Sequence, residues 1–329
     1  DYHRQHFWQP EYTPVDDILQ WPGNGDTTLG QAWRLAPFSD RNGNGKYEPF
    51  DGDYPEIRGD QALFFIFNDE ANYHSETQGD PLRIEVHGLA YAFDLPEDSA
   101  LNNAIFLHYK IFNRSQNTYD STYLGVFTDI DLGYAADDYH RCDVERGMLI
   151  GYNGTPVDGM GQPNAYGENP PAQGVTILAG PYMDPDGIDN PRYGNTGEQL
   201  CDYSVNGANF GDTAIDNERF GMTRFMYFNN SSAGVPDYMT DPRYAPEYYK
   251  YLRGIWKDGT PMMYGGNAHP TTGGYGPACW FMFPGLSDTL NWGAGCAPPN
   301  GPVNWTEETA ANNPQDRRGM QSSGPFTFH

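Results

Sequence analysis

The sequence has no long hydrophobic run and few positive charges. No apolar stretch approaches the roughly 20 residues that a helix needs to cross a bilayer, so we expect no membrane insertion. Lysine and arginine number 19 against 44 aspartates and glutamates, which gives a formal net charge of −25. Because nucleic acids and anionic lipids are negative, this balance argues against both as partners and favours cations.

Cysteine is scarce, and its spacing is not that of a metal site. The four cysteines form no Cys-x-x-Cys pair and have no clustered histidines nearby, which argues against zinc. One or two disulfides would fit an oxidising compartment. The preferred pairing joins Cys279 to Cys296 and Cys142 to Cys201. Other pairings, and free buried thiols, remain open.

Familiar catalytic motifs are also missing. The sequence contains no His-Glu-x-x-His, no Gly-x-Ser-x-Gly, no phosphate-binding loop and no dinucleotide fingerprint. His3 and His6 lack an adjacent glutamate, so we interpret them as surface or packing residues. Carboxylates are abundant, but glycoside hydrolysis needs two of them facing each other at a defined separation, and the sequence does not show such a pair. The sequence therefore favours a protein that is not an enzyme.

Strand-forming residues dominate the first half of the chain. Segments rich in Ile, Val, Phe and Tyr, separated by turn residues, predict strands at 61–68, 82–94, 103–113 and 122–130. Uneven alternation in the second predicts a bulge near Gly88. Shorter candidates follow at 148–152, 174–178 and 222–228, and residues 245–256 show the spacing of a helix.

These patterns predict a mostly β fold, an antiparallel β-sandwich with long loops rich in Gly, Pro and Asp and one or two short helices. The 39 glycines and 27 prolines indicate abundant loops, and 24 tyrosines and 18 phenylalanines supply a core. We expect a single domain over 1–329, dense in strands over about 56–153 and rich in loops over about 154–329. After Lys257 we expect loops wrapped on the sandwich. A start at Asp1 suggests a piece of a longer secreted precursor.

Residues 40–51 have the spacing of a calcium loop. Oxygen side chains occupy its first, third, fifth, ninth and twelfth positions, and Gly45 at the sixth permits the sharp turn. The predicted ligands are the side chains of Asp40, Asn42, Asn44 and Asp51, the backbone carbonyl of Lys46, and Glu48 directly or through water. The alternative is a set of Asx turns without metal, because Asn, Asp and Gly form turns unaided.

Other acidic groups are weaker calcium candidates. One group combines Asp129 and Asp131 with the later pair Asp137 and Asp138, which would converge on one cation. A compact turn contributes a further set of candidate ligands, Asp184, Asp186 and Asp189. A third group, Asp212, Asp216 and Glu218, is better explained as plain surface. Calcium is thus the expected cofactor, and it would staple the long loops.

Several segments resemble large secreted Bacteroidetes proteins exported by the type IX secretion system. They include Trp21-Pro22-Gly23-Asn24-Gly25, Gly52-Asp53-Tyr54-Pro55, Asp131-Leu132-Gly133, Asn217-Glu218-Arg219-Phe220-Gly221-Met222 and Ser322-Ser323-Gly324-Pro325-Phe326. The loop at 40–51 looks like those of dockerin-type modules. The resemblance implies an extracellular or outer cell-surface location and a longer precursor with a C-terminal sorting domain. It implies no known reaction.

A short repeated pattern agrees with that resemblance. Asp-Ser/Thr followed by a small or apolar residue resembles the O-glycosylation site of these bacteria, and it recurs five times. The acceptors would be Thr27, Ser99, Ser121, Thr213 and Thr289, which should then be exposed. Each Asp-Ser/Thr can equally form a turn or a helix cap.

Together these features predict a secreted, calcium-stabilised structural or adhesive module of a bacterial surface or extracellular assembly. Exposed strand edges would let it associate with itself, including as filaments, or with other domains of the same surface protein. Two alternatives remain. Seven tryptophans and many tyrosines would suit a carbohydrate-binding module with glycans as partners, and a calcium-dependent extracellular hydrolase would need a concave site with converging polar groups.

Overall fold

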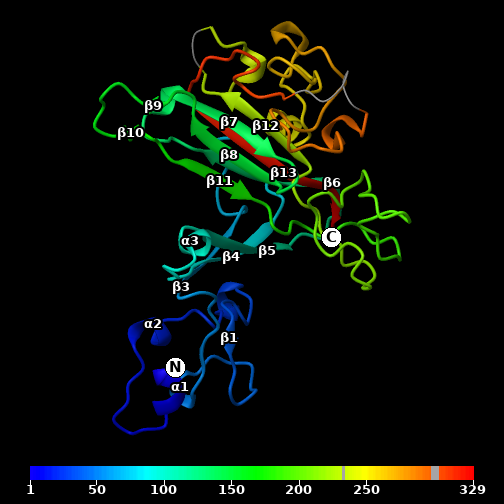
Figure 1. The fold of residues 1–329 in the computed structure, drawn as a ribbon. Helices are drawn as coiled ribbons and strands as arrows, with labels where there is room; N and C mark the ends of the chain where they lie inside the picture. Colours follow the sequence, from blue (N-terminus) through cyan, green and yellow to red (C-terminus); the bar gives the residue numbers. More distant parts are fainter. Residues whose placement is uncertain (232–233, 298–303) are drawn as a thin grey trace. The chain divides into compact units, whose positions relative to one another are not determined.

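The computed structural model describes residues 1–231, 234–297 and 304–329 (Figure 1). The fold is mostly β with antiparallel sheets, so the predicted fold class is confirmed. Two compact units are distinguished: the first contains residues 1–73 and 80–116, and the second contains residues 74–79 and 117–329. Within the described residues, no helix is both long and apolar enough to span a membrane.

The secondary structure consists of short helices and mostly short strands. The α-helices are α1 (Tyr2–His6), α2 (Asp16–Leu19), α3 (Ser99–Asn102) and α4 (Ala245–Leu252). The 3₁₀ turns are η1 (Thr27–Leu29), η2 (Pro49–Asp51), η3 (Ala135–Asp137), η4 (Asp237–Met239), η5 (Pro270–Thr272) and η6 (Trp292–Ala294). The strands are β1 (Phe38–Ser39), β2 (Tyr54–Pro55), β3 (Gln61–Asn68), β4 (Ile84–Ala92), β5 (Ile105–Asn113), β6 (Tyr119–Asp129), β7 (Asp138–Asp143), β8 (Met148–Asn153), β9 (Val157–Asp158), β10 (Gly167–Glu168), β11 (Ala172–Thr176), β12 (Arg224–Asn229) and β13 (Arg317–Phe328).

The first unit is built around the three-stranded sheet β3-β4-β5. Its register is continuous, with Phe65 opposite Gly88 and Gly88 opposite Tyr109, so the predicted bulge at Gly88 is wrong. The glycine has a packing role instead. A Cβ at Gly88 would lie 2.3 Å from the Phe65 ring, so any larger residue at this position would clash with that ring.

The two faces of this sheet differ in chemistry. Side chains alternate between faces along each strand, and residues directly opposite share a face. One face is mostly apolar and has polar side chains only at its ends, Gln61 and Asn113, and at Tyr109; on it Leu63, Leu107 and Ile105 are 66%, 57% and 78% exposed. The other face includes His87 and Lys110. Exposed apolar side chains that lie next to one another are typical of a surface that contacts another molecule.

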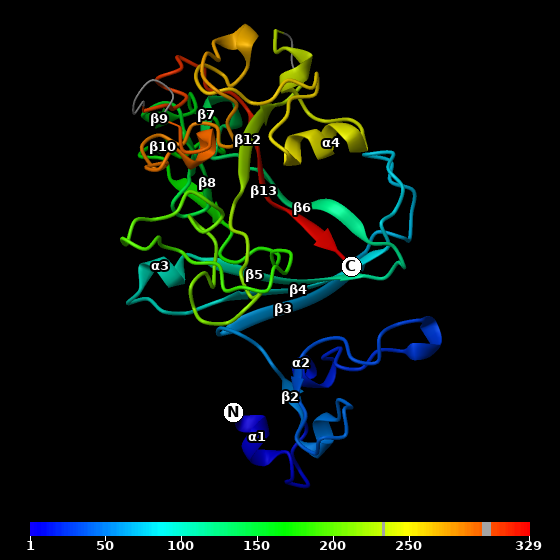
Figure 2. The same ribbon diagram turned by 90° about the vertical axis from the view of Figure 1, so that its right-hand side faces the viewer.

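The second unit contains two three-stranded sheets, β11-β8-β7 and β12-β13-β6. The two sheets pack face to face, as in a sandwich. Their close contact is seen at Gly319 of β13, where an added Cβ would lie 2.1 Å from the Leu149 side chain of β8. The opposite face of β12-β13-β6 is covered by α4: Ser322 donates a hydrogen bond of 2.6 Å to the carbonyl of Leu252. Figure 2 shows α4 alongside β13 and β6. Aromatic residues fill the core, among them Trp256, which is fully buried.

Strand β13 corrects one expectation. The region after Lys257 was predicted to consist of loops, yet β13 is the central strand of its sheet, between β12 and β6. Its middle is small and polar: Gln321, Ser322 and Ser323 are fully buried, and each donates a side-chain hydrogen bond to a backbone carbonyl. A strand satisfied in this way lacks the apolar alternation by which strands are recognised in sequence.

Candidate calcium centres

The loop at 40–51 takes the sharp turn that its sequence predicts. Gly45 has a φ of +82°, and the Asp40 carboxylate accepts hydrogen bonds from the N–H of Gly43 at 2.8 Å and of Gly45 at 2.7 Å. The Asn42 side chain accepts from the N–H of Asn44 at 3.0 Å. This curled backbone suits a calcium loop, and it is also what Asx turns without metal would form. Calcium at this loop therefore stays a prediction.

A residue that sequence reasoning did not single out holds both ends of this loop. Asp53 is fully buried, and its two carboxylate oxygens accept from the N–H of Arg41 at 2.8 Å and of Glu48 at 2.9 Å. The Glu48 carboxylate also accepts from the Asn44 side chain at 2.6 Å. Asp51 lies in η2 and is exposed. Asp53 lies two residues after the end of the twelve-residue pattern, so the pattern could not identify it.

Among the described residues, one set of three acidic side chains brings carboxylate oxygens within 4.8 Å of one another: Asp129, Asp131 and Asp316. This set already has a positive partner. The Arg318 guanidinium lies 3.3 Å from Asp129 and 2.7 Å from Asp316, and it also reaches Asp241 at 3.3 Å. An arginine in this position supplies the charge that a metal would otherwise bring.

The predicted pair Asp137 and Asp138 does not join that set. Asp137 ends η3, Asp138 begins β7, and both lie near Asp158 of β9. Burial raises the pKa of Asp137, and the carboxylate of Asp158 raises it further. Burial likewise raises the pKa of Asp138 to about 7, and repulsion from Asp137 and Asp158 adds to the increase. These three carboxylates interact electrostatically, although they do not bring one oxygen each within 4.8 Å of one another, and we call them the β7 acidic centre.

The oxygens of the β7 acidic centre are only partly satisfied. One oxygen of Asp138 accepts from the N–H of Leu132 at 3.0 Å, while its Oδ1 is buried and has no hydrogen-bond partner. The same holds for Asp137, whose Oδ2 accepts from Gly159 at 2.8 Å while Oδ1 has none. A buried acceptor without a donor costs about 1 to 3 kcal/mol, and more when it is charged.

Asn153 of β8 supplies a third buried oxygen without a donor, and we count it with the β7 acidic centre. Asn153 is directly opposite Asp138 in the β7–β8 pair, so the two side chains share a face. Its amide nitrogen donates to Thr155 at 2.7 Å, which fixes the orientation of the amide, and its buried Oδ1 has no partner. None of the ion pairs within the described residues involves Asp137, Asp138 or Asp158. Two carboxylate oxygens and one amide oxygen are the hard donors that calcium prefers.

Backbone donors fix Asp158, the third carboxylate of the β7 acidic centre. Asp158 is 1% exposed, and its carboxylate accepts hydrogen bonds from the N–H of Tyr134 at 2.9 Å and of Tyr166. Gly133 makes this approach feasible, because a Cβ there would lie 2.0 Å from Asp158 Oδ2. Sequence reasoning missed Asp158 and Asn153, since neither belongs to a recognisable spacing with Asp137 and Asp138.

The predicted ligands in the turn 184–189 are not brought together. Asp184 accepts from the N–H and hydroxyl of Thr327 at 2.6 and 2.7 Å. Asp189 accepts instead from the N–H of Gly211 and Thr213, at 2.9 and 2.7 Å. Each carboxylate thus satisfies a different part of the chain. Asp186 stays local, accepting from the N–H two residues later at 3.0 Å.

Asp212, Asp216 and Glu218 were predicted to be ordinary surface residues, but two of the three hold neighbouring loops through hydrogen bonds. Asp216 accepts from the N–H of Asp186 and of Gly187, both at 2.8 Å, so it ties the two acidic loops together. Glu218 is buried and accepts from the N–H of Asn190. Only Asp212 behaves as predicted, being exposed with local hydrogen bonds.

The cysteines correct the preferred pairing. The disulfide joins Cys201 to Cys296, and Cys142 and Cys279 are free and buried, so the pairings Cys142–Cys201 and Cys279–Cys296 are both wrong. Burial raises the pKa of both free thiols. Cys142 and Cys279 both lie in the hydrophobic core, and the spacing of the cysteines in the sequence does not indicate which two of them meet.

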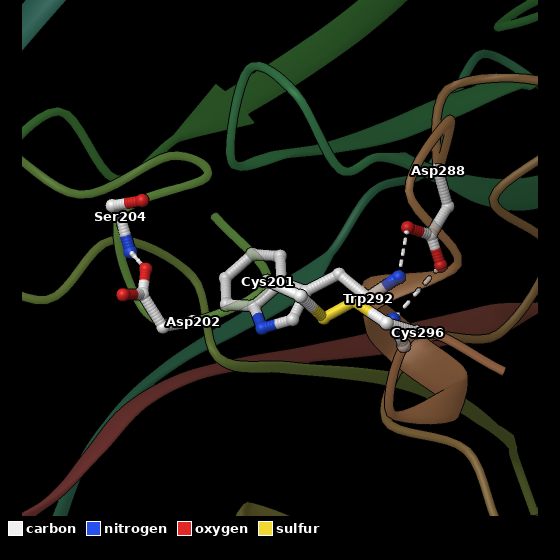
Figure 3. Close-up of a disulfide and its surroundings, with 7 residues drawn as sticks. Cys201, Asp202, Ser204, Asp288, Trp292 and Cys296 are labelled. Atoms are coloured by element: carbon white, nitrogen blue, oxygen red, sulfur yellow. Dashed lines mark hydrogen bonds between the residues drawn. A yellow bond between two sulfur atoms is a disulfide. The ribbon is translucent and has the colours of Figure 1, made fainter. Parts of the chain in front are cut away.

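Both ends of the disulfide lie next to turns stabilised by carboxylates (Figure 3). Asp288 accepts from the N–H of Trp292 at 2.7 Å and of its neighbour Gly293 at 2.9 Å, which holds η6 just before Cys296. Beyond Cys201, Asp202 accepts from the N–H of Ser204 at 2.8 Å. The bridge therefore connects two locally fixed turns across 95 residues of sequence.

All five proposed glycan acceptors are exposed, as glycosylation requires: Thr27, Ser99, Ser121, Thr213 and Thr289. The aspartates before them also serve the alternative interpretation. Asp26, Asp98 and Asp212 each accept a hydrogen bond from the N–H two residues later. Exposure is met, and the modification itself stays a prediction.

Comparison with known proteins finds no matching family model, no matching curated protein and no matching solved structure.

Proposed function

We propose that this chain is a secreted, calcium-stabilised structural or adhesive module of a bacterial cell-surface or extracellular assembly, of the kind exported by type IX secretion. Calcium would fasten its acidic loops, and the module would associate through exposed sheet surfaces. The observation that carries the proposal is the β7 acidic centre, where buried oxygens of Asp137, Asp138 and Asn153 lack donors.

A calcium ion accounts for these oxygens better than the chain alone does. Buried carboxylates are normally paired with a cation or with enough donors to offset the loss of water. Asp138 is 1% exposed, one of its oxygens has no donor, and two further carboxylates are nearby. An ion held by Asp137, Asp138 and Asn153, with water or backbone oxygens completing its shell, would neutralise this charge and satisfy all three orphaned acceptors.

Two features support an extracellular role. Disulfides such as Cys201–Cys296 persist mainly in oxidising compartments. Calcium sites of extracellular modules typically have dissociation constants of about 10⁻⁴ to 10⁻³ M, so they are suited to the high calcium concentration outside cells. Five exposed Asp-Ser/Thr acceptors would suit a glycosylated surface protein. The similarity to secreted Bacteroidetes proteins points in the same direction.

The sheet β3-β4-β5 supports an assembly role. Strands β3 and β5 are its outer strands, and within the described residues neither pairs with a further strand. One face exposes Leu63, Ile105 and Leu107. Open edges and exposed apolar faces are the surfaces through which β proteins associate. A charge of −25 opposes association between copies, so bound calcium would weaken that repulsion.

Sedimentation velocity in millimolar calcium and after chelation tests this assembly role. We expect larger species in calcium that return to monomers after chelation. Leu107→Asp should reduce assembly, because it places a charge on the apolar face. Leu286→Asp is the matched control, since Leu286 is also exposed but lies outside that sheet. Monomers in both conditions, or equal effects of the two variants, would contradict an assembly role.

A further inference from the structure

The first unit contains a cavity of about 520 Å³ that the calcium interpretation does not use. One wall is a face of the β3-β4-β5 sheet, with Phe64, Leu89 and His108 directly opposite one another on the three strands. The other wall comes from residues 34–38 and 56–58. Its volume lies in the range of small-molecule sites and would accommodate one or two sugar rings.

The cavity is positive in a strongly negative protein. Arg34, Arg58 and Lys110 line it against a single carboxylate, Glu56. The whole chain has 19 basic and 44 acidic residues, so three cations to one acid reverse the general balance. Long-range repulsion would keep anions away from most of the surface and leave this site as a local exception.

Two of these cations have no internal counter-ion. No carboxylate forms an ion pair with Arg58 or Lys110 in the part of the chain that the structure describes. Arg34 is engaged, because its guanidinium lies 4.3 Å from the centre of the Phe38 ring and 3.9 Å from Asp40. Cations without carboxylate partners beside a cavity are available to an incoming anion.

The nearest acidic side chain on the sheet is already neutralised. Glu85 accepts from Arg114 at 2.7 Å and is 2.7 Å from the His87 ring. The hydrogen bond from Arg114 lowers the pKa of Glu85. The carboxylate therefore stays paired and does not compete for Lys110, which is directly opposite His87 on β5.

Aromatic rings add a second kind of contact. Phe38, Phe64 and Phe112 line the cavity together with the cations. Aromatic faces bind the apolar side of sugar rings, while Arg and Lys bind carboxylates. We propose that this cavity binds an acidic sugar, a uronic acid unit of a glycan, with its carboxylate on Arg58 and Lys110 and its ring against Phe64 and Phe112. The proposal does not depend on calcium.

Binding of digalacturonate, measured by NMR titration of the whole chain in chelator, tests this site. We expect saturable binding and at least tenfold weaker affinity for neutral digalactose. Arg58→Gln and Lys110→Gln should each weaken digalacturonate binding about tenfold. Arg146→Gln is the control, because Arg146 is an exposed cation outside the cavity. Unchanged amide spectra of the free variants would establish that each variant folds.

Three results would overturn the proposal. Absence of binding would exclude the acidic sugar. Equal affinity for digalactose would exclude a role for the carboxylate. If inorganic sulfate displaced digalacturonate and bound with equal affinity, the cations would act without the aromatic rings, and the cavity would be a general anion site.

Discussion

Glu307→Ala is expected to lower the free energy of unfolding by about 3 to 5 kcal/mol. Glu307 is fully buried and pairs with Arg317, which is also buried, at 2.8 Å. The glutamate additionally accepts from the N–H of His140 at 2.7 Å. Alanine would leave a buried guanidinium without its counter-ion, although it still donates to Asn229 and Asn313, and a buried N–H without its acceptor. Breaking one side of such a pair costs far more than the pair contributes.

Urea unfolding measures this loss, and the neighbouring residue supplies the control. Glu308 is exposed and its side chain accepts one hydrogen bond, from the Tyr152 hydroxyl at 3.0 Å, so Glu308→Ala should change stability by less than about 1 kcal/mol. The double variant Glu307→Ala with Arg317→Ala should cost less than the sum of the single variants. Similar losses for Glu307→Ala and Glu308→Ala would contradict a buried ion pair at this position.

Removing the disulfide should have an effect of similar size. The bridge closes a span of 95 residues, for which the loss of unfolded-state entropy corresponds to about 4 to 5 kcal/mol. The double variant Cys201→Ser with Cys296→Ser is therefore expected to unfold at markedly lower urea concentration than the oxidised wild type. The turns at Asp202 and Asp288 would remain but would no longer be connected to each other.

Reducing agent separates this effect from that of the buried thiols. It should destabilise the wild type to the level of the double variant and leave the variant unchanged, since Cys142 and Cys279 are already reduced. Peptide mapping under non-reducing conditions should recover a linked peptide containing Cys201 and Cys296. A linked Cys142 or Cys279, or four free thiols, would refute the connectivity.

The sequence predicted those parts of the fold that have a strong apolar pattern. Strand β3 occurs with the predicted bounds, and β4, β5 and α4 lie within the predicted ranges. Strand β13 was missed because its buried middle is polar, and hydrogen bonds to backbone carbonyls replace apolar contacts there. Such a strand forms because of its tertiary contacts, and its sequence lacks the apolar alternation from which a strand is predicted.

The candidate sites divide in the same way. The turn at 40–51 could be predicted because its spacing is local and Gly45 has the required conformation. The β7 acidic centre could be predicted only in part, because Asn153 and Asp158 reach it through strand pairing and a later loop. Arg318, which neutralises Asp129, lies almost two hundred residues away in sequence and shares its ladder only after folding.

Thermal unfolding with and without calcium tests the central claim most directly. In millimolar calcium the wild type should unfold several degrees higher than in chelator, because a site of typical extracellular affinity contributes about 1 to 2 kcal/mol. Asp138→Asn should lose part of this increase and should be no less stable than the wild type in chelator, since it removes a buried charge. Asp80→Asn, at an exposed position outside the acidic groups and the glycan motifs named above, should behave as the wild type. Equal midpoints of the wild type in calcium and in chelator would contradict calcium stabilisation.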